Sequence, residues 1–163
     1  MLKYRSIICV LLLIGTFTFA ESRSICPFEI PVVVVSYFPT NGPMVDISIT
    51  GDWGSTLLET KAKTERQTRE LIAALAEGSR YHAYRNPDAK PSLKYLLLTT
   101  FEFNEPVPVC SRKSGQNVPM TDYNAITKRI DIRHLVEECG VKEVWIWGYD
   151  GGKVGLWESN MAG

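Results

Sequence analysis

VVVVSYF, residues 32–38, is the stretch that decides the fold of this chain. Four valines followed by Ser36, Tyr37 and Phe38 make a β-branched and aromatic run, which Pro39 ends. The run does not alternate between apolar and polar residues, as a strand with one face in water does. It therefore predicts a strand that is covered on both faces.

Two later runs predict further strands. Residues 93–103 carry four leucines and two phenylalanines, and the prolines at 106 and 108 end regular pairing after them. Residues 144–147, Val-Trp-Ile-Trp, are apolar throughout, and a glycine-rich turn follows at 148–152. We expect Trp145 and Trp147 to lie on the two faces of this buried strand.

A helix is expected over residues 64–77. Thr64 and Gln67 have the spacing of a capping box, in which each side chain bonds a free backbone N–H of the first turn. Gly78 is a natural stop. The expected apolar face consists of Leu71, Ile72, Ala74 and Leu75.

Helical spacing returns over residues 122–139. The pattern either continues or restarts at Asp131, and Gly140 has the position of a helix-terminating glycine, with Val141 placed for the usual apolar cap contact. The apolar residues of the first part are spaced three and four apart: Tyr123, Ile126 and Ile130.

Strand, helix, strand, helix, strand is the order of an open α/β fold. We expect the strands at 32–38, 94–103 and 143–149 to be mutually parallel in one sheet. Right-handed crossovers would then place the two helices as layers on that sheet, in a three-layer arrangement. Residues 154–157 suit one more short strand, which would form a C-terminal hairpin.

Residues 1–20 have the pattern of a secretory signal peptide. The first five residues hold two basic side chains and no acid, residues 7–19 are mostly apolar, and small Thr18 and Ala20 precede polar Glu21. The apolar run is shorter than the roughly 20 residues of a membrane-spanning helix. We therefore expect cleavage after Ala20, a secreted protein, and a single domain over residues 21–163 with no later transmembrane segment.

Charge and cysteine content narrow the expected partners. The chain has 18 basic and 18 acidic side chains, and removing the leader takes away Lys3 and Arg5. The slight acidic excess argues against nucleic acid and leaves an extracellular ligand of unknown kind as the expected partner. In an oxidising compartment we expect one disulfide and one leftover thiol, with the pairing open, among Cys26, Cys110 and Cys139.

Candidate site residues follow from the topology, because ligands of open α/β sheets bind at the carboxyl ends of the strands. The alternative is that these polar residues are solvated parts of loops. The residues at the expected ends are Ser36, Tyr37 and Thr40 after the first strand, Glu102, Asn104 and Glu105 after the second, and Tyr149, Asp150, Glu158, Ser159 and Asn160 after the third.

Two functions fit this rim. The first is hydrolase-like chemistry on an extracellular polymer or glycan, with Asp150 and Glu158 as the catalytic carboxylates. The second is non-catalytic binding of a carbohydrate or a protein, with Trp157 as a stacking residue. A pair of carboxylates in one cleft, one with a raised pKa, would favour the enzyme, and an open tryptophan surface without such a pair would favour binding.

Metal and cofactor chemistry is not expected. The two histidines, His82 and His134, form no compact ligand pair with each other or with acids. The chain has no Gly-x-Ser-x-Gly nucleophile elbow, and the glycines at 148–155 lack the Gly-Lys-Ser/Thr of a phosphate-binding loop.

The segment 141–163 resembles a family of uncharacterised secreted α/β proteins. The shared pattern is Val-Trp-x-x-Gly followed by Trp-Glu-Ser-x-Met-Ala-Gly, which here covers Val144–Gly148 and Trp157–Gly163. The run at 32–39 is similar to the first strand of that family. The resemblance implies secretion and an α/β fold, and it implies that this chain is the N-terminal part of a longer protein.

Overall fold

Three parallel strands form the main sheet of the described chain. They are β1 (Phe28–Tyr37), β4 (Leu93–Phe103) and β7 (Glu143–Trp147), in the order β4-β1-β7. The computed structural model describes residues 27–51, 53–80, 88–111, 119–149 and 154. β1 pairs in parallel with both neighbours, which confirms the predicted mainly parallel sheet.

β1 is covered on both faces, as its valine run predicts. The side chains from Val32 to Val35 are at most 2% exposed. β4 is one residue longer than β1. The register between them shifts at Leu98, because Val32 pairs with Leu97 and Val33 pairs with Thr99. On this edge strand both Leu97 and Leu98 are exposed, unlike the valines beside them.

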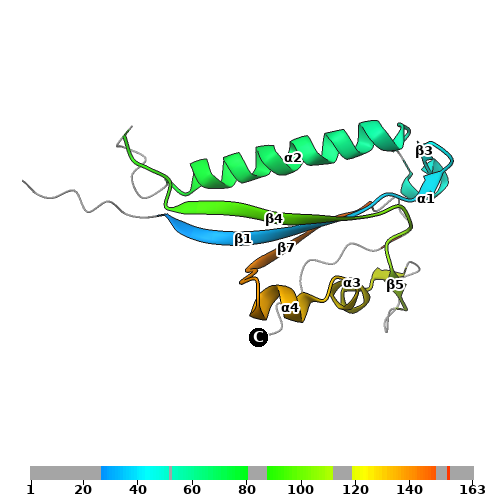
Figure 1. Cartoon of the computed structure of the whole chain (residues 1–163). Helices are drawn as coiled ribbons and strands as arrows, with labels where there is room; N and C mark the ends of the chain where they lie inside the picture. Colours follow the sequence, from blue (N-terminus) through cyan, green and yellow to red (C-terminus); the bar gives the residue numbers. More distant parts are fainter. Residues whose placement is uncertain (1–26, 52, 81–87, 112–118, 150–153, 155–163) are drawn as a thin grey trace, which may run out of the picture.

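The helices cover opposite faces of the sheet (Figure 1). α2 (Leu57–Gly78) lies over one face, and α3 (Tyr123–Arg129) and α4 (Ile132–Glu137) lie under the other. β4 lies on one side of β1 and β7 on the other, so two crossovers of the same hand run over opposite faces. The chain therefore has the expected three-layer α/β fold.

α2 begins earlier than predicted. Its N-cap is Thr56, whose Oγ1 accepts from the N–H of Glu59, while the Glu59 carboxylate accepts from the Thr56 N–H at 3.0 Å. The predicted capping box of Thr64 and Gln67 is wrong, because Thr64 is a buried residue inside the helix. The pairs Thr56–Glu59 and Thr64–Gln67 have the same spacing, and uninterrupted helix follows the earlier pair.

Threonines, and not the predicted leucines, form the most buried stripe of α2. Thr60, Thr64 and Thr68 lie one turn apart, and each is buried against the sheet side of the helix. Each hydroxyl donates to the carbonyl four residues earlier, at 2.9 to 3.0 Å, so the buried polar atom is satisfied. Leu71, by contrast, is 39% exposed.

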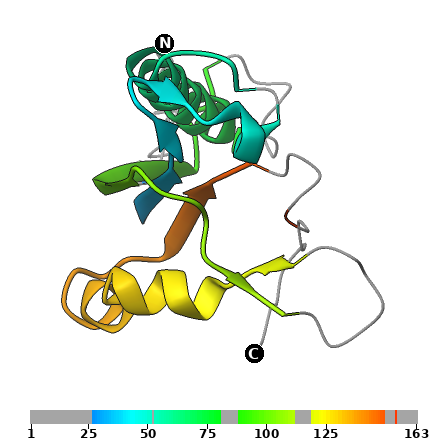
Figure 2. The same ribbon diagram turned by 90° about the vertical axis from the view of Figure 1, so that its right-hand side faces the viewer.

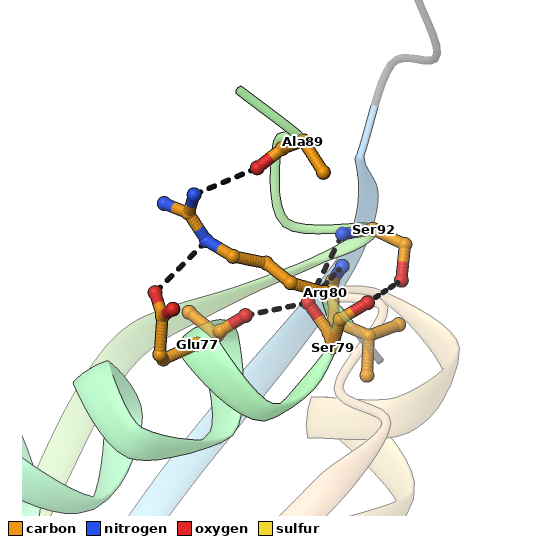
Figure 3. A network of polar contacts seen from close by, with 7 residues as sticks. Glu77, Ser79, Arg80, Ala89 and Ser92 are labelled. Carbon is orange, nitrogen blue, oxygen red and sulfur yellow. Dashed lines mark hydrogen bonds and ion pairs between the residues drawn. The ribbon is translucent and has the colours of Figure 1, made fainter. Parts of the chain in front are cut away.

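A polar network joins the end of α2 to the start of β4 (Figure 3). Ser79 Oγ donates to the Ala76 carbonyl and accepts from the Ser92 N–H at 3.0 Å. The Arg80 guanidinium donates to the Ala89 carbonyl at 2.7 Å and forms an ion pair with Glu77. These bonds fix the entry into β4 relative to the helix.

The second helical region is two helices, so of the two alternatives that the sequence leaves open at Asp131 the structure shows the restart. Asp131 has a φ of 50°, a left-handed conformation that breaks the helix, and its side chain caps α4. Gly140 has a φ of 70°, and the Val141 N–H donates to the Leu135 carbonyl at 3.0 Å. Val141 and Leu135 both belong to the hydrophobic core cluster.

Short elements gather at the carboxyl end of the sheet, which Figure 2 views nearly end on. β2, β3 and α1 follow β1, on the α2 side, and β5 and β6 follow β4, on the α3 side. Their bounds are Thr40–Asn41, Met44–Val45 and Ile47–Thr50 for the first three, and Val109–Cys110 and Met120–Thr121 for the other two.

The cysteines that the structure describes are not joined. Cys110 and Cys139 are both exposed and free. A Cys110–Cys139 disulfide, one of the three expected pairings, is therefore not formed in this structure. Cys26 lies outside the described residues.

Candidate functional site

The strand order places a topological switch point between β1 and β7. The chain leaves β1 toward β4 over one face and then crosses under β1 to reach β7 on the other side. The first connection leaves the carboxyl end of β1 and the second leaves the carboxyl end of β4, so the direction of the strand order reverses between β1 and β7. Open α/β sheets bind their ligands outside the carboxyl ends of the strands at such a reversal. The site is therefore expected beside Trp147 and Gly148.

A groove occupies this position. Its volume is about 530 Å³, within the range of small-molecule sites. One wall is the first half of α2, another is the loop before that helix, and the end of β7 closes it. We call it the switch groove; its lining residues are Trp53, Gly54, Ser55, Glu59, Thr60, Lys63, Thr64, Gln67, Trp147 and Gly148.

Trp147 forms the sheet side of the switch groove. It pairs in register with Ser36 and, two residues earlier, Trp145 pairs with Val34. Residues two apart on a strand point to the same face, so both tryptophans lie on the α2 side. The expectation that they occupy opposite faces is wrong. The Trp147 Nε1 donates to Thr68 Oγ1 at 3.0 Å, which fixes the indole against the helix.

Trp53 is the second aromatic residue of the groove. Its ring meets the ring of Tyr149 edge to face, with centroids 6.0 Å apart and planes at 79°. Both Trp53 and Trp147 are half-buried and line the groove. The groove therefore offers two positioned indoles to a ligand.

The helical wall carries polar side chains on successive turns. Glu59, Lys63 and Gln67 are each four residues apart, which places them on one face of α2. Hydrogen bonds from the Thr56 hydroxyl and backbone N–H hold the pKa of the Glu59 carboxyl below its usual range. Glu59 is thus a carboxylate at neutral pH, committed to the helix cap.

The predicted rim is divided between the two faces of the sheet. Ser36 and Glu102 pair in register and lie on the α2 face, where Glu102 forms an ion pair with Lys61 at 2.7 Å. Tyr37 and Phe103 pair one residue later and lie on the opposite face. The alternation of strand side chains therefore separates residues that the sequence order brings to one end.

Tyr37 lies in a buried cluster on the α3 side. Its ring is 5.1 Å from that of Phe103, and the Arg129 guanidinium lies over the Phe103 ring at 3.7 Å while it also pairs with Glu105. Burial raises the pKa of the Tyr37 phenol, against the lowering effect of the Arg129 charge. The Tyr37 hydroxyl is buried without a hydrogen-bond partner of normal geometry among the described residues.

Tyr149 is buried next to this end of the sheet. Its hydroxyl accepts from the Val107 N–H at 3.1 Å, and burial raises its pKa. The predicted catalytic carboxylates Asp150 and Glu158, and the stacking candidate Trp157, lie outside the described residues.

A second hollow lies on the other side of α2, toward β4. Its volume is about 470 Å³ and its lining is mainly apolar, with Val34, Leu58 and Leu97 among the contributors. The charged residues at its edge are already paired, Lys61 with Glu102 and Arg69 with Glu65. The switch groove is the better ligand site because it holds aromatic rings together with polar groups that are free to bind.

Within residues 27–149 apart from their undescribed gaps, no cluster of three or more histidine, cysteine or acidic side chains could hold a metal ion. In the same part of the chain, no helix combines the length and the apolar character needed to cross a membrane.

Sequence reasoning missed Trp53, Lys63 and Gln67. Trp53 lies between Gly51 and Gly54, the same combination of tryptophan and glycine that draws attention to the segment after β7. The four-residue spacing of Glu59, Lys63 and Gln67 can also be read from the sequence. The helix was expected to start only at Thr64, however, which left Glu59 and Lys63 outside it.

No protein family model, curated protein or solved structure matches this chain.

Proposed function

We propose that this protein is a secreted, non-catalytic module that binds a carbohydrate in the switch groove. The observation that carries the proposal is that Trp53 and Trp147 line one groove together with Glu59, Lys63 and Gln67. An indole stacks on the apolar face of a sugar ring, and polar side chains around it bond the hydroxyls at its edge.

Binding fits the groove better than hydrolysis does. Glycoside hydrolysis uses two carboxyl groups on either side of the scissile bond, one of which must hold a proton. Of the described residues that line the groove, Glu59 is the one with a carboxyl group, and its pKa is lowered. The hydrolase-like alternative depends on Asp150 and Glu158, so it needs a test of its own.

The test is calorimetric titration of the protein with a panel of neutral and acidic mono- and disaccharides. We expect Trp53→Ala and Trp147→Phe to weaken the binding of any saccharide that binds. Trp145→Phe is the matched control, because Trp145 lies on the same face of the same strand but packs on Tyr95 outside the groove. Folding of each variant is checked by circular dichroism.

Failure of every saccharide to bind would contradict the proposal, as would equal affinity in all three variants. Release of reducing sugar from an oligosaccharide, abolished in Asp150→Asn or Glu158→Gln, would establish the enzymatic alternative instead.

Secretion is tested separately. The leader pattern leads us to expect Glu21 at the N-terminus of the protein recovered from the medium, as read by mass spectrometry. Retention of residues 1–20 in a membrane fraction would contradict this part of the proposal.

A further inference from the structure

Lys63 differs from the other basic residues of α2 in its lack of a partner. Lys61 pairs with Glu102, Arg66 with Glu70 and Arg69 with Glu65. Within the part of the chain that the structure describes, Lys63 has no ion pair and no side-chain hydrogen bond. Lys63 nevertheless lines the switch groove.

The cause is the helix cap. Glu59 lies four residues before Lys63, the spacing at which an acid and a base commonly pair on a helix. The Glu59 carboxylate instead accepts from the Thr56 N–H at 3.0 Å and from the Thr56 hydroxyl at 2.7 Å. These bonds hold it toward the helix N-terminus, where the free N–H groups of the first turn offset its charge.

Gln67 continues this wall one turn beyond Lys63, about 5.4 Å further along the helix. Its amide is half-buried, lines the groove and has no hydrogen bond among the described residues. A cation and an amide donor on adjacent turns suit the two oxygens of a carboxylate. The indoles of Trp53 and Trp147 lie in the same groove.

We infer that the switch groove prefers acidic sugars, with the carboxylate of a uronic acid bound by Lys63 and Gln67 and its ring stacked on tryptophan. This inference rests on the proposed carbohydrate binding and adds the class of sugar. It involves no chemical step, because the ligand binds and dissociates unchanged.

The test compares ligands that differ by one charge and one methyl group: the methyl glycosides of glucuronic and galacturonic acid, each beside its uncharged methyl ester. We expect at least one acid to bind about fivefold more tightly than its ester at low salt, the gain of one exposed ion pair. The difference should shrink as the ionic strength rises toward 1 M.

Variants of α2 assign the preference. Lys63→Gln should remove the difference between acid and ester, because it weakens the binding of the acid more than the binding of the ester. Lys63→Arg should keep the difference. Gln67→Glu should abolish it, because the new carboxylate pairs with Lys63 and repels the ligand. Arg66→Gln is the control, since it makes the same change of charge on an exposed residue outside the groove.

The two proposals fail in different ways. Binding of neutral sugars with no preference for either acid would overturn this inference and leave the proposed function standing. An equal ratio of acid to ester affinity in Lys63→Gln and the unchanged protein would also overturn it. If no sugar binds at all, both proposals are wrong.

Discussion

The indole Nε1 of Trp147 donates a hydrogen bond to the hydroxyl of Thr68, 79 residues earlier in the chain, at 3.0 Å. Thr68 in turn donates its hydroxyl proton to the Thr64 carbonyl at 2.9 Å. Thr68 thus accepts a hydrogen bond from β7 and donates one within its own helix. The bond between Trp147 and Thr68 links β7 to α2 beside the switch groove and orients one of the two tryptophans of the groove.

We predict that Thr68→Val destabilises the protein by about 1 kcal/mol, because the Trp147 N–H loses its acceptor. Thr64→Val is the matched control, since the Thr64 hydroxyl bonds only the Thr60 carbonyl of the same helix among the described residues. It should change the free energy of unfolding less. Equilibrium unfolding in urea measures both.

A double-mutant cycle isolates the bond. Trp147→Phe combined with Thr68→Val should cost less than the sum of the two single changes, by about 1 kcal/mol, because the second change removes an interaction already lost. Strict additivity would show that the hydrogen bond contributes nothing to stability.

The capping box gives the second prediction. Thr56→Ala should destabilise α2 by about 1 kcal/mol, since the first turn loses a side-chain acceptor. Thr127→Ala, in which an exposed hydroxyl bonds carbonyls of its own short helix, should cost less. Thermal and urea unfolding give the comparison, and an equal loss in the two variants would contradict it.

The same cap makes stability depend on pH. The hydrogen bonds from Thr56 lower the folded-state pKa of Glu59, so its carboxylate form is favoured in the folded protein. Its contribution is therefore present above the pKa of an unfolded glutamate and is lost as the pH falls through the folded-state value. This acid-side loss of stability should be smaller in Thr56→Ala than in the unchanged protein.

The fold could be predicted from the sequence because its strands are continuous apolar runs. The valines at 32–35 can be buried only between two layers, and the intervening helical segments supply those layers. The threonine stripe of α2 could not be predicted in this way. Threonine counts as polar in an apolar pattern, yet Thr60, Thr64 and Thr68 bury their hydroxyls by bonding the helix carbonyls.

The site could be predicted only in its location. The rule of strand carboxyl ends led to the edge of the sheet where the switch groove lies, but the alternation of side chains sends Tyr37 and Ser36 to opposite faces. Trp53 and Lys63 enter the groove from a loop and a helix that fold over the sheet. Both residues are far from Trp147 in the sequence. Nothing in their own segments indicates that they lie close to it in the fold.

The third prediction concerns two buried tyrosines. Tyr149→Phe should destabilise the protein by about 1–3 kcal/mol, because the buried Val107 N–H loses its acceptor. Tyr37→Phe should cost less than Tyr149→Phe, because the Tyr37 hydroxyl makes no hydrogen bond of normal geometry among the described residues, although the nearby Arg129 lowers its pKa. Each variant removes one oxygen from a buried ring, so the two changes in the free energy of unfolding, measured in urea, can be compared directly.

Both phenols also affect stability at alkaline pH. Burial raises the folded-state pKa of Tyr37 and Tyr149 above the usual value for tyrosine. Their contribution is therefore fully present below the unfolded pKa of about 10, and it is lost as the pH rises from there through the folded-state value. Burial also raises the pKa of Tyr95, so ultraviolet titration should find these three tyrosines ionising late, and one fewer in each variant.

The last prediction concerns two glycines that end helices in different ways. Gly140 follows α4 with a φ of 70°, whereas Gly78 is the last residue of α2 and has no positive φ. A Cβ at either position would meet nothing within 4 Å, so crowding is the same for both. Gly140→Ala should therefore cost about 1 kcal/mol from backbone strain alone. Gly78→Ala should stabilise by about 0.4–1 kcal/mol, because it restricts the unfolded chain.

Asparagine tolerates the left-handed conformation, so Gly140→Asn should lose less stability than Gly140→Ala. Urea unfolding of the three variants tests the order, and equal effects of alanine at both positions would show that the left-handed turn after α4 does not constrain residue 140.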